Sequence, residues 1–203
     1  MRKIAKLLLT SLLLLVAFWI VDVVHDRQTL SNDLIRLHVV ANSDSEEDQT
    51  IKLRVRDAVT GYLQEKMSHI TDKDAAMAFL QQHIDRLTEL ANQVLTELGV
   101  SDRAEITLTK ETFPTRQYDT FTLPAGVYES LRIRIGEAEG RNWWCVVFPS
   151  LCFQAVGEDF TDTAAGAGFD EPLTGALEGE APYQVRFFLL DCLGWLQNFF
   201  HQN

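Results

Sequence analysis

The chain has 203 residues, 46% of them hydrophobic, which is enough for one hydrophobic core with shorter segments attached. Its formal net charge is −11, although the first six residues include three basic side chains. An acidic body of this kind repels phosphate backbones, and no basic stripe interrupts it. The composition therefore argues against binding to nucleic acid.

The first segment has the features of a membrane signal. Three basic residues in "MRKIAK" precede the apolar run "LLLTSLLLLVAFWIV", which stops at Asp22. The 18 residues from Ile4 to Val21 are just long enough to cross a bilayer as a helix. Positive charge before the run and an acid after it predict a cytoplasmic N-terminus and an extracytoplasmic body. No clear cleavage motif follows, so we expect residues 1–24 to be an uncleaved signal anchor, with a cleaved signal peptide as the alternative.

A strand and the start of a helix follow. Residues 34–41 alternate as a strand, with Ile35, Leu37, Val39 and Ala41 on one face and Arg36 and His38 on the other. The polar cluster after it fits a helix start in two frames. Ser43 precedes Glu46, and Ser45 precedes Asp48, by the three residues of a capping box. Acidic residues in the first turn also complement the helix dipole.

The helix that begins there has one apolar residue out of place. Its apolar stripe consists of Ile51, Val55, Ala58, Val59 and Tyr62. At about 100° per residue, Leu53 falls on the opposite side, near Arg56 and Asp57. Either a second element covers Leu53, or Leu53 is an exposed contact point for a partner.

The pattern then changes from helix to strand. Apolar residues at three- and four-residue steps predict an amphipathic helix from Met77 to Leu98, ended by Gly99. Alternating residues predict later strands, and the last two of these, 128–135 and 142–148, flank "GEAEG", which has the composition of a hairpin loop.

Helices followed by strands indicate an α+β domain over residues 30–153, with amphipathic helices packed on an antiparallel sheet. Residues 154–184 contain seven acidic and no basic residues, which predicts an acidic flexible linker. Residues 185–203 are strongly apolar, but Asp191 and the short length argue against a second membrane span. We expect a C-terminal helix that docks on the domain, with an interfacial or partner-binding helix as the alternative.

No arrangement of residues predicts catalysis or a metal site. The sequence lacks the G-x-S-x-G, H-E-x-x-H and P-loop motifs. His38, Ser43 and Asp44 have the residue types of a triad, but the first lies on a strand and the others serve the helix start. Asp44, Glu46 and Asp48 alternate as calcium ligands do, but the glycine and terminal glutamate of an EF-hand are missing. We therefore expect no catalytic residue, no metal and no cofactor.

Two cysteines and two tryptophans lie in or beside the last strand. Cys145 and Cys152 flank an F-P step, and a tight reversal there would bring them within disulfide range; otherwise they are two buried thiols. Burial in a strand makes Cys145 a poor nucleophile. Trp143 and Trp144 point to opposite faces of a regular strand, so at most one belongs to the core.

Three blocks of the sequence carry a resemblance to a known family. They are "IRLHVVANSDSEEDQTIKLRVRDAV", "LPAGVYESLRIRIGEAEGRNWWCVVFPSLCF" and "VRFFLLDCLGWL". Together they resemble stage II sporulation protein R of endospore-forming bacteria. The resemblance extends from about Leu34 to the C-terminus and weakens in the acidic linker.

The resemblance implies a signalling protein that is made in the forespore and exported into the space between the forespore and mother-cell membranes. Such proteins activate, by binding, a membrane-embedded aspartic protease of the mother cell that processes a sigma factor precursor, and they are not known as enzymes. A secreted hydrolase and a structural envelope protein are the alternatives. From the matching blocks we select the partner-binding candidates Arg36, His38, Asn42, Asp44, Leu53, Arg56, Asp57, Trp143 and Trp144.

Overall fold

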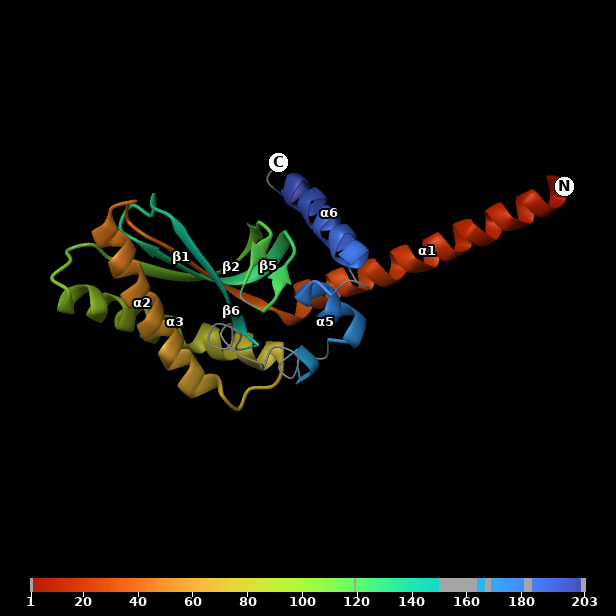
Figure 1. Cartoon of the computed structure of the whole chain (residues 1–203). Coiled ribbons are helices and arrows are strands. Elements are labelled where there is room, and N and C mark those ends of the chain that lie inside the picture. The colour runs from red at the N-terminus through yellow and green to blue at the C-terminus, as the bar shows by residue number, and fades with distance from the viewer. Residues whose placement is uncertain (1, 119, 150–163, 167–168, 181–183, 202–203) are drawn as a thin grey trace.

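The computed structural model of the chain describes residues 2–118, 120–149, 164–166, 169–180 and 184–201. Its centre is a four-stranded sheet with helices on both faces, and a long N-terminal helix projects from this body (Figure 1). The predicted α+β class is therefore confirmed.

The sheet has the strand order β2-β5-β1-β6. Its central pair, β1 and β5, is parallel, whereas β2 and β6 pair antiparallel with their neighbours at the two edges, so the sheet is mixed and not antiparallel throughout as predicted. A separate ribbon joins β3 to β4. The strands are β1 Ile35–Val40, β2 Ala104–Phe113, β3 Arg116–Gln117, β4 Thr122–Leu123, β5 Gly126–Ile135 and β6 Asn142–Phe148.

The predicted hairpin between β5 and β6 is wrong, because β1 lies between these two strands. All six residues of β1 are buried, so β1 needs a hydrogen-bonded neighbour on each side. The loop Gly136–Gly140 crosses the end of β1 and does not join β5 to β6 as a hairpin. Its amides donate to the two residues that directly follow β1, from Gly140 N to Ala41 O (3.0 Å) and from Glu139 N to Asn42 O (3.1 Å).

The first face of the sheet is covered by α2 (Glu46–Met67) and α3 (Lys73–Glu97). Both helices were predicted from their apolar stripes, and α3 stops before Gly99, which has a φ of +72° that favours glycine. Their core with the sheet includes Ile35, Leu37, Val39, Val55, Val59, Leu80, Leu87, Ala91, Leu131, Ile133 and Ile135.

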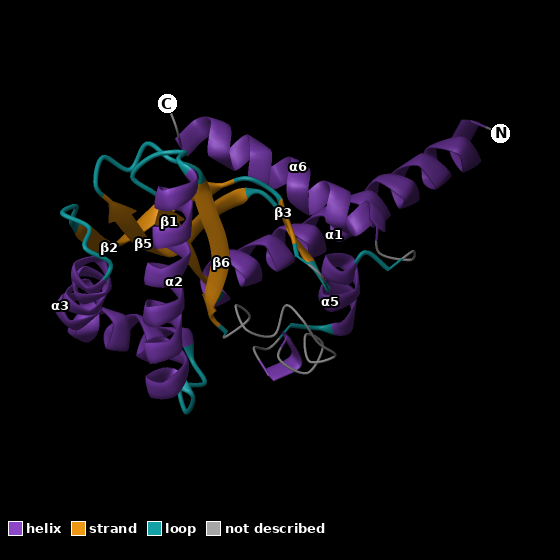
Figure 2. Ribbon diagram, turned by 60° about the vertical axis from the view of Figure 1, so that its left-hand side comes forward, coloured by secondary structure: helices purple, strands orange, loops and turns teal. Residues whose placement is uncertain are grey.

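The second face is covered by the end of α1 (Arg2–Asp33), by α5 (Glu171–Glu178) and by α6 (Gln184–His201), which lie together in both ribbon views (Figures 1 and 2). A second core joins them to the sheet and includes Val23, Leu30, Phe113, Tyr128, Val146, Leu173, Leu177 and Leu190. The domain is thus a helix–sheet–helix sandwich.

Two predicted boundaries need correction. The flexible linker predicted over 154–184 is wrong for α5, because Leu173 and Leu177 are buried in the second core and Asp170 caps the helix. The body also starts before residue 30, because α1 continues without a break from the apolar run into buried Val23 and Leu30. The sequence analysis missed this start of the body, because the strongly apolar run dominates the pattern and obscures the amphipathic end of the helix.

α6 docks on the body through polar contacts, as well as through buried Leu190. Arg186 makes ion pairs with Asp22 and Asp26 on α1. The carboxylate of Asp191 accepts a hydrogen bond from the backbone N–H of Ala125 (2.8 Å). These contacts confirm the predicted docking of the C-terminal helix.

Candidate partner-binding surface

Arg36 was predicted to contact a partner, but its side chain is completely buried. The guanidinium donates from Nε to Cys145 O (3.2 Å) and from Nη2 to Tyr118 Oη (3.0 Å). It also lies 4.3 Å from the ring centre of Phe113 and 5.1 Å from that of Tyr128. A cation surrounded in this way strengthens the second core and is not available to a partner.

His38, the other polar residue of β1, is also buried. Its ring stacks on Trp144 at 3.8 Å, and its nitrogens bond to Glu111 and Asn142, each at 2.9 Å. Burial raises the pKa of the Glu111 carboxyl, but the hydrogen bond from His38 and the positive charge of Arg132 outweigh this, and the pKa lies below its ordinary value. The network fixes β1 to both sheet edges, since Glu111 lies on β2 and Asn142 on β6.

The prediction that Arg36 and His38 form part of a contact surface is therefore wrong. The alternation of β1 correctly placed them on the face opposite Ile35. That face is not exposed, however, because α1, α5 and α6 cover it. Trp144 lies on the same side and is only half-buried, whereas Trp143 points to the other side, as expected for neighbours in a strand.

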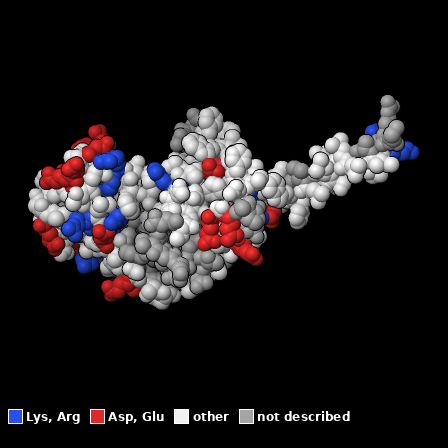
Figure 3. Space-filling view, viewed as in Figure 1, with Lys and Arg blue, Asp and Glu red and all other residues white. Residues whose placement is uncertain are grey.

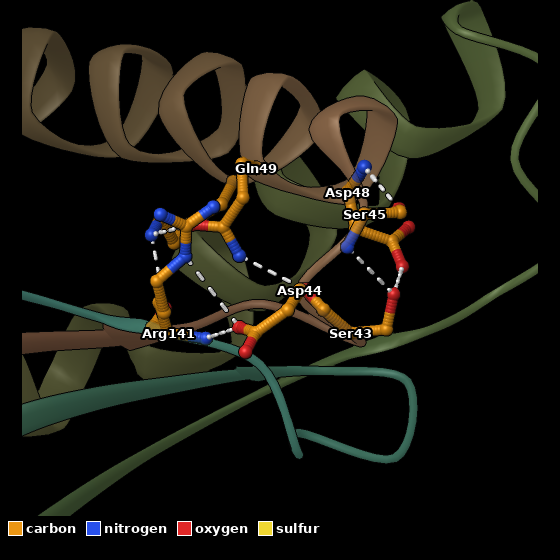
Figure 4. A network of polar contacts seen from close by, with 7 residues as sticks. Ser43, Asp44, Ser45, Asp48, Gln49 and Arg141 are labelled. Carbon is orange, nitrogen blue, oxygen red and sulfur yellow. Dashed lines mark hydrogen bonds and ion pairs between the residues drawn. The ribbon is translucent and has the colours of Figure 1, made fainter.

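The polar cluster after β1 is the start of α2, and Ser45 is its N-cap. The Ser45 hydroxyl accepts from Asp48 N (3.1 Å), so the second of the two predicted frames is the correct one. Ser43 links the two, because its hydroxyl accepts from Ser45 N (3.1 Å) and donates to the Asp48 carboxylate. Figure 4 shows the hydrogen bond from Ser43 to Asp48. Together with a hydrogen bond from Asn42, it holds the pKa of Asp48 below its ordinary value.

Asp44 connects this cap to β6. Its carboxylate accepts from Arg141 N (2.6 Å) and lies 3.6 Å from Arg141 Nε. Lys52 on α2 donates to Arg141 O (2.9 Å) and to Gln49 Oε1 (2.6 Å), and burial lowers the pKa of its amine. A Cβ added to Gly140 would lie 2.1 Å from Ser43 O, so only glycine fits here. The cap and the start of β6 thus form one rigid unit.

Beside this unit, α2 and β6 present exposed groups. The Arg56 guanidinium lies 4.2 Å from the ring centre of Trp143, whose residue is 38% exposed, and pairs with Asp57. Leu53 is half-buried, so it is neither fully covered by a second element nor fully exposed as a contact point. We call this region the α2–β6 surface; it consists of Asp44, Leu53, Arg56, Asp57, Arg141 and Trp143.

Arg141 was missed by the sequence analysis. Its role depends on the loop crossing β1, and no local pattern predicts that crossing. Asn42, which was predicted to contact the partner, is half-buried and donates from Nδ2 to Asp48 Oδ2 (3.1 Å). It therefore supports the α2–β6 surface without belonging to it.

The structure does not assemble the triad considered above, because His38 bonds to Glu111 and Asn142, whereas Ser43 bonds to Asp48. Within the described ranges, no group of three His, Cys, Asp or Glu side chains could hold a metal ion. Cys145 is buried in β6, and Cys152 lies outside the described residues, so the bridge between them stays a prediction.

Comparisons with known proteins match the chain to one family. The family described as stage II sporulation protein R matches residues 31–158. Stage II sporulation protein R of Bacillus subtilis (strain 168) is 30% identical over 193 residues, covering 84% of this chain and 83% of that protein. No solved structure matches the chain. The matched residues contain the whole α2–β6 surface.

Proposed function

The chain belongs to the stage II sporulation protein R family, and on this premise we propose that it is an exported forespore-to-mother-cell signal that acts by binding. Its proposed partner is a membrane-embedded aspartic protease of the mother cell, which then processes the precursor of a sigma factor. The family is a sporulation signalling family and not a known enzyme family. The proposal assigns the chain no chemistry of its own.

The α2–β6 surface is the observation that carries a binding mechanism. It combines an aromatic ring, an arginine stacked on it and an apolar side chain, the types that dominate the energy of protein interfaces. The rigid cap beneath it, with Lys52 and Asp44 bonded to Arg141, holds these groups in place before a partner arrives. Binding to a preformed surface avoids much of the entropy lost when side chains are ordered.

The long helix α1 supports an extracytoplasmic location. Its residues Lys6–Asp33 are long and apolar enough to cross a membrane, as are those of many signal sequences near an N-terminus. Large side chains of the apolar run, among them Leu14 and Phe18, are exposed on the protein and need an apolar environment. We propose that α1 is retained and holds the body at the membrane in the space between forespore and mother cell.

The experiment reconstitutes the membrane protease in vesicles with its sigma factor precursor and adds the full chain to the outside. Processing of the precursor is measured as a function of the concentration of the chain. Arg56→Glu removes the stacking on Trp143 and reverses the charge at the centre of the α2–β6 surface. We expect it to raise the concentration needed for half-maximal processing by about 10-fold or more, which corresponds to about 1.4 kcal/mol of binding.

Arg54→Glu is the matched control. It makes the same charge change two residues away at an exposed position of α2, about 200° around the helix from Arg56. It should leave processing unchanged. If both variants process normally, the α2–β6 surface is not the binding site. If the unaltered chain binds the protease without starting processing, activation by binding is wrong.

A further inference from the structure

The C-terminal helix α6 exposes a large apolar face, although it also buries Leu190 in the second core. Its polar side chains Arg186, Asp191 and Asn198 face the body and bond to α1 and to the backbone around β2 and β5. Its opposite face is apolar and exposed. Helices on the surface of a globular domain normally bury the apolar face.

The exposed face is continuous and large. Seven residues share a stripe about 140° wide at 100° per residue. The six large apolar side chains among them are each 54–70% exposed, and the seventh residue is the exposed Cys192. The stripe consists of Val185, Phe188, Cys192, Trp195, Leu196, Phe199 and Phe200.

α6 begins where the apolar run of α1 ends. Asp22, which directly follows the run, pairs with Arg186 in the first turn of α6, and Asp26 one turn further along α1 pairs with the same arginine. Four residues of helix span about 6 Å, which is about the depth of the headgroup region on one side of a bilayer. A bilayer crossed by α1 therefore has its surface at the level of α6.

We propose that the exposed face of α6 lies in the surface of the membrane that α1 enters, with its aromatic side chains among the lipid headgroups and upper acyl chains. Trp and Phe on an otherwise apolar face are typical of interfacial helices. On the face seen in Figure 3, the projecting part of α1 carries charge only near its N-terminal end, whereas charged side chains gather at the end of the body that carries α2 and in an acidic patch over α5. The α2–β6 surface then points away from the membrane of its own cell.

The contact is apolar and needs no acidic lipid. The stripe has no basic residue, and Arg186, the one cation on the polar face of the helix among residues 184–201, is held by Asp22 and Asp26. We therefore expect equal contact with vesicles of phosphatidylcholine alone and with vesicles that contain phosphatidylglycerol, and little effect of salt. Strong dependence on acidic lipid would contradict an apolar contact.

The test places a fluorescent label on Cys192 of the full chain, reconstituted in phosphatidylcholine vesicles that contain lipids with a nitroxide quencher on the acyl chain. Two further labels are compared, each on a new cysteine introduced into a Cys192→Ala background. The Cys192→Ala chain without a new cysteine is treated with the label as well, and it measures how much label reacts with the other cysteines. Leu14→Cys lies in the apolar run, and Gln64→Cys is exposed on α2, away from α6. The fluorescence of the label at position 192 should fall nearly as much as that at position 14, and the label at position 64 should lose little.

The inference rests on the retained membrane segment proposed above, and the label at position 14 tests that segment separately. Quenching at position 14 but not at position 192 would overturn the inference and leave the anchor intact. Shielding of position 192 from a soluble quencher only after addition of the protease would show that a protein covers this face, and would also overturn it. Phe188→Ser with Phe199→Ser should reduce quenching at position 192 and leave position 14 unchanged.

Discussion

Replacing Gly194 in the middle of α6 with alanine tests how closely this helix packs. A Cβ at this position would lie 1.6 Å from the carbonyl oxygen of Ala125 and 2.5 Å from its carbonyl carbon. Both are backbone atoms, which cannot rotate away as a side chain does. α6 must move by about 2 Å before the new methyl group is at an ordinary contact distance.

The cost can be worked from the contacts at stake. Overpacking of this kind costs about 1–3 kcal/mol. The displacement also weakens the hydrogen bonds of Asp191 with Ala125 and of Asn198 with Phe113, each worth about 0.5–1.5 kcal/mol. The better helix propensity of alanine returns about 1 kcal/mol. The expected loss in the free energy of unfolding is therefore about 3 kcal/mol, within a range of about 1–5.

Gly61→Ala provides the matched comparison, since the same change in α2 places a Cβ with no atom within 4 Å. This variant should gain about 1 kcal/mol from helix propensity alone. The assay is denaturant unfolding of the full chain in one detergent. Unfolding is followed by tryptophan fluorescence and not by helix content, because the part of α1 inside the micelle stays helical throughout. If Gly194→Ala unfolds at the same or a higher denaturant concentration than the unaltered chain, α6 does not pack on Ala125 as described.

Three further results are expected. Ser45→Ala removes the N-cap of α2 and should lower the free energy of unfolding by about 1 kcal/mol, and Ser43→Ala should act similarly through Asp48; loss of signalling at an unchanged unfolding midpoint would instead give the hydroxyl a direct role in binding. The lowered pKa of Glu111 contributes stability that is present above the ordinary carboxyl pKa of about 4.3 and is lost as the pH falls through the lower folded value. Glu111→Gln should therefore weaken the dependence of the unfolding midpoint on pH below about pH 5. The same dependence on pH in both proteins would contradict the ion pair with His38. The body exported by an unrelated signal sequence should still signal and a strictly cytoplasmic form should not, as measured by sigma factor processing in sporulating cells; normal signalling from the cytoplasmic form would refute the proposed location.

Elements that depend on local pattern were predictable from the sequence. The apolar stripes of α2 and α3 and the alternation of β1 gave their positions and their buried faces, because each pattern repeats over many residues. The position of β1 in the sheet was not predictable, since a strand pattern does not name its neighbours. Adjacent strands in sequence favoured a β5–β6 hairpin, but the complete burial of β1 required two partners and overrode it.

The candidate site was predictable only in part, for the same reason. Helical and strand periodicity place Arg56, Asp57 and Trp143 on outward faces, and the structure brings Arg56 into contact with the other two. Arg36 and His38 were taken for exposed residues, because polar side chains are seldom buried. Their burial depends on contacts with side chains such as Phe113, Tyr118 and Trp144, which lie more than 70 residues further along the chain. No local sequence window contains those contacts.

The position of β1 also sets the order in which an exported chain can fold. β1 follows the apolar run closely in the sequence. The residues that pair with β1 come much later, from Glu129 on β5 to Phe148 on β6. Until those residues have crossed the membrane, the central strand has no neighbours, and closing so long a loop is slow. Trp143 lies on β6 and Arg141 directly precedes it, so the surface proposed to activate the protease does not exist on a partly translocated chain. Under the proposed function, only molecules whose export has passed this point can activate the protease.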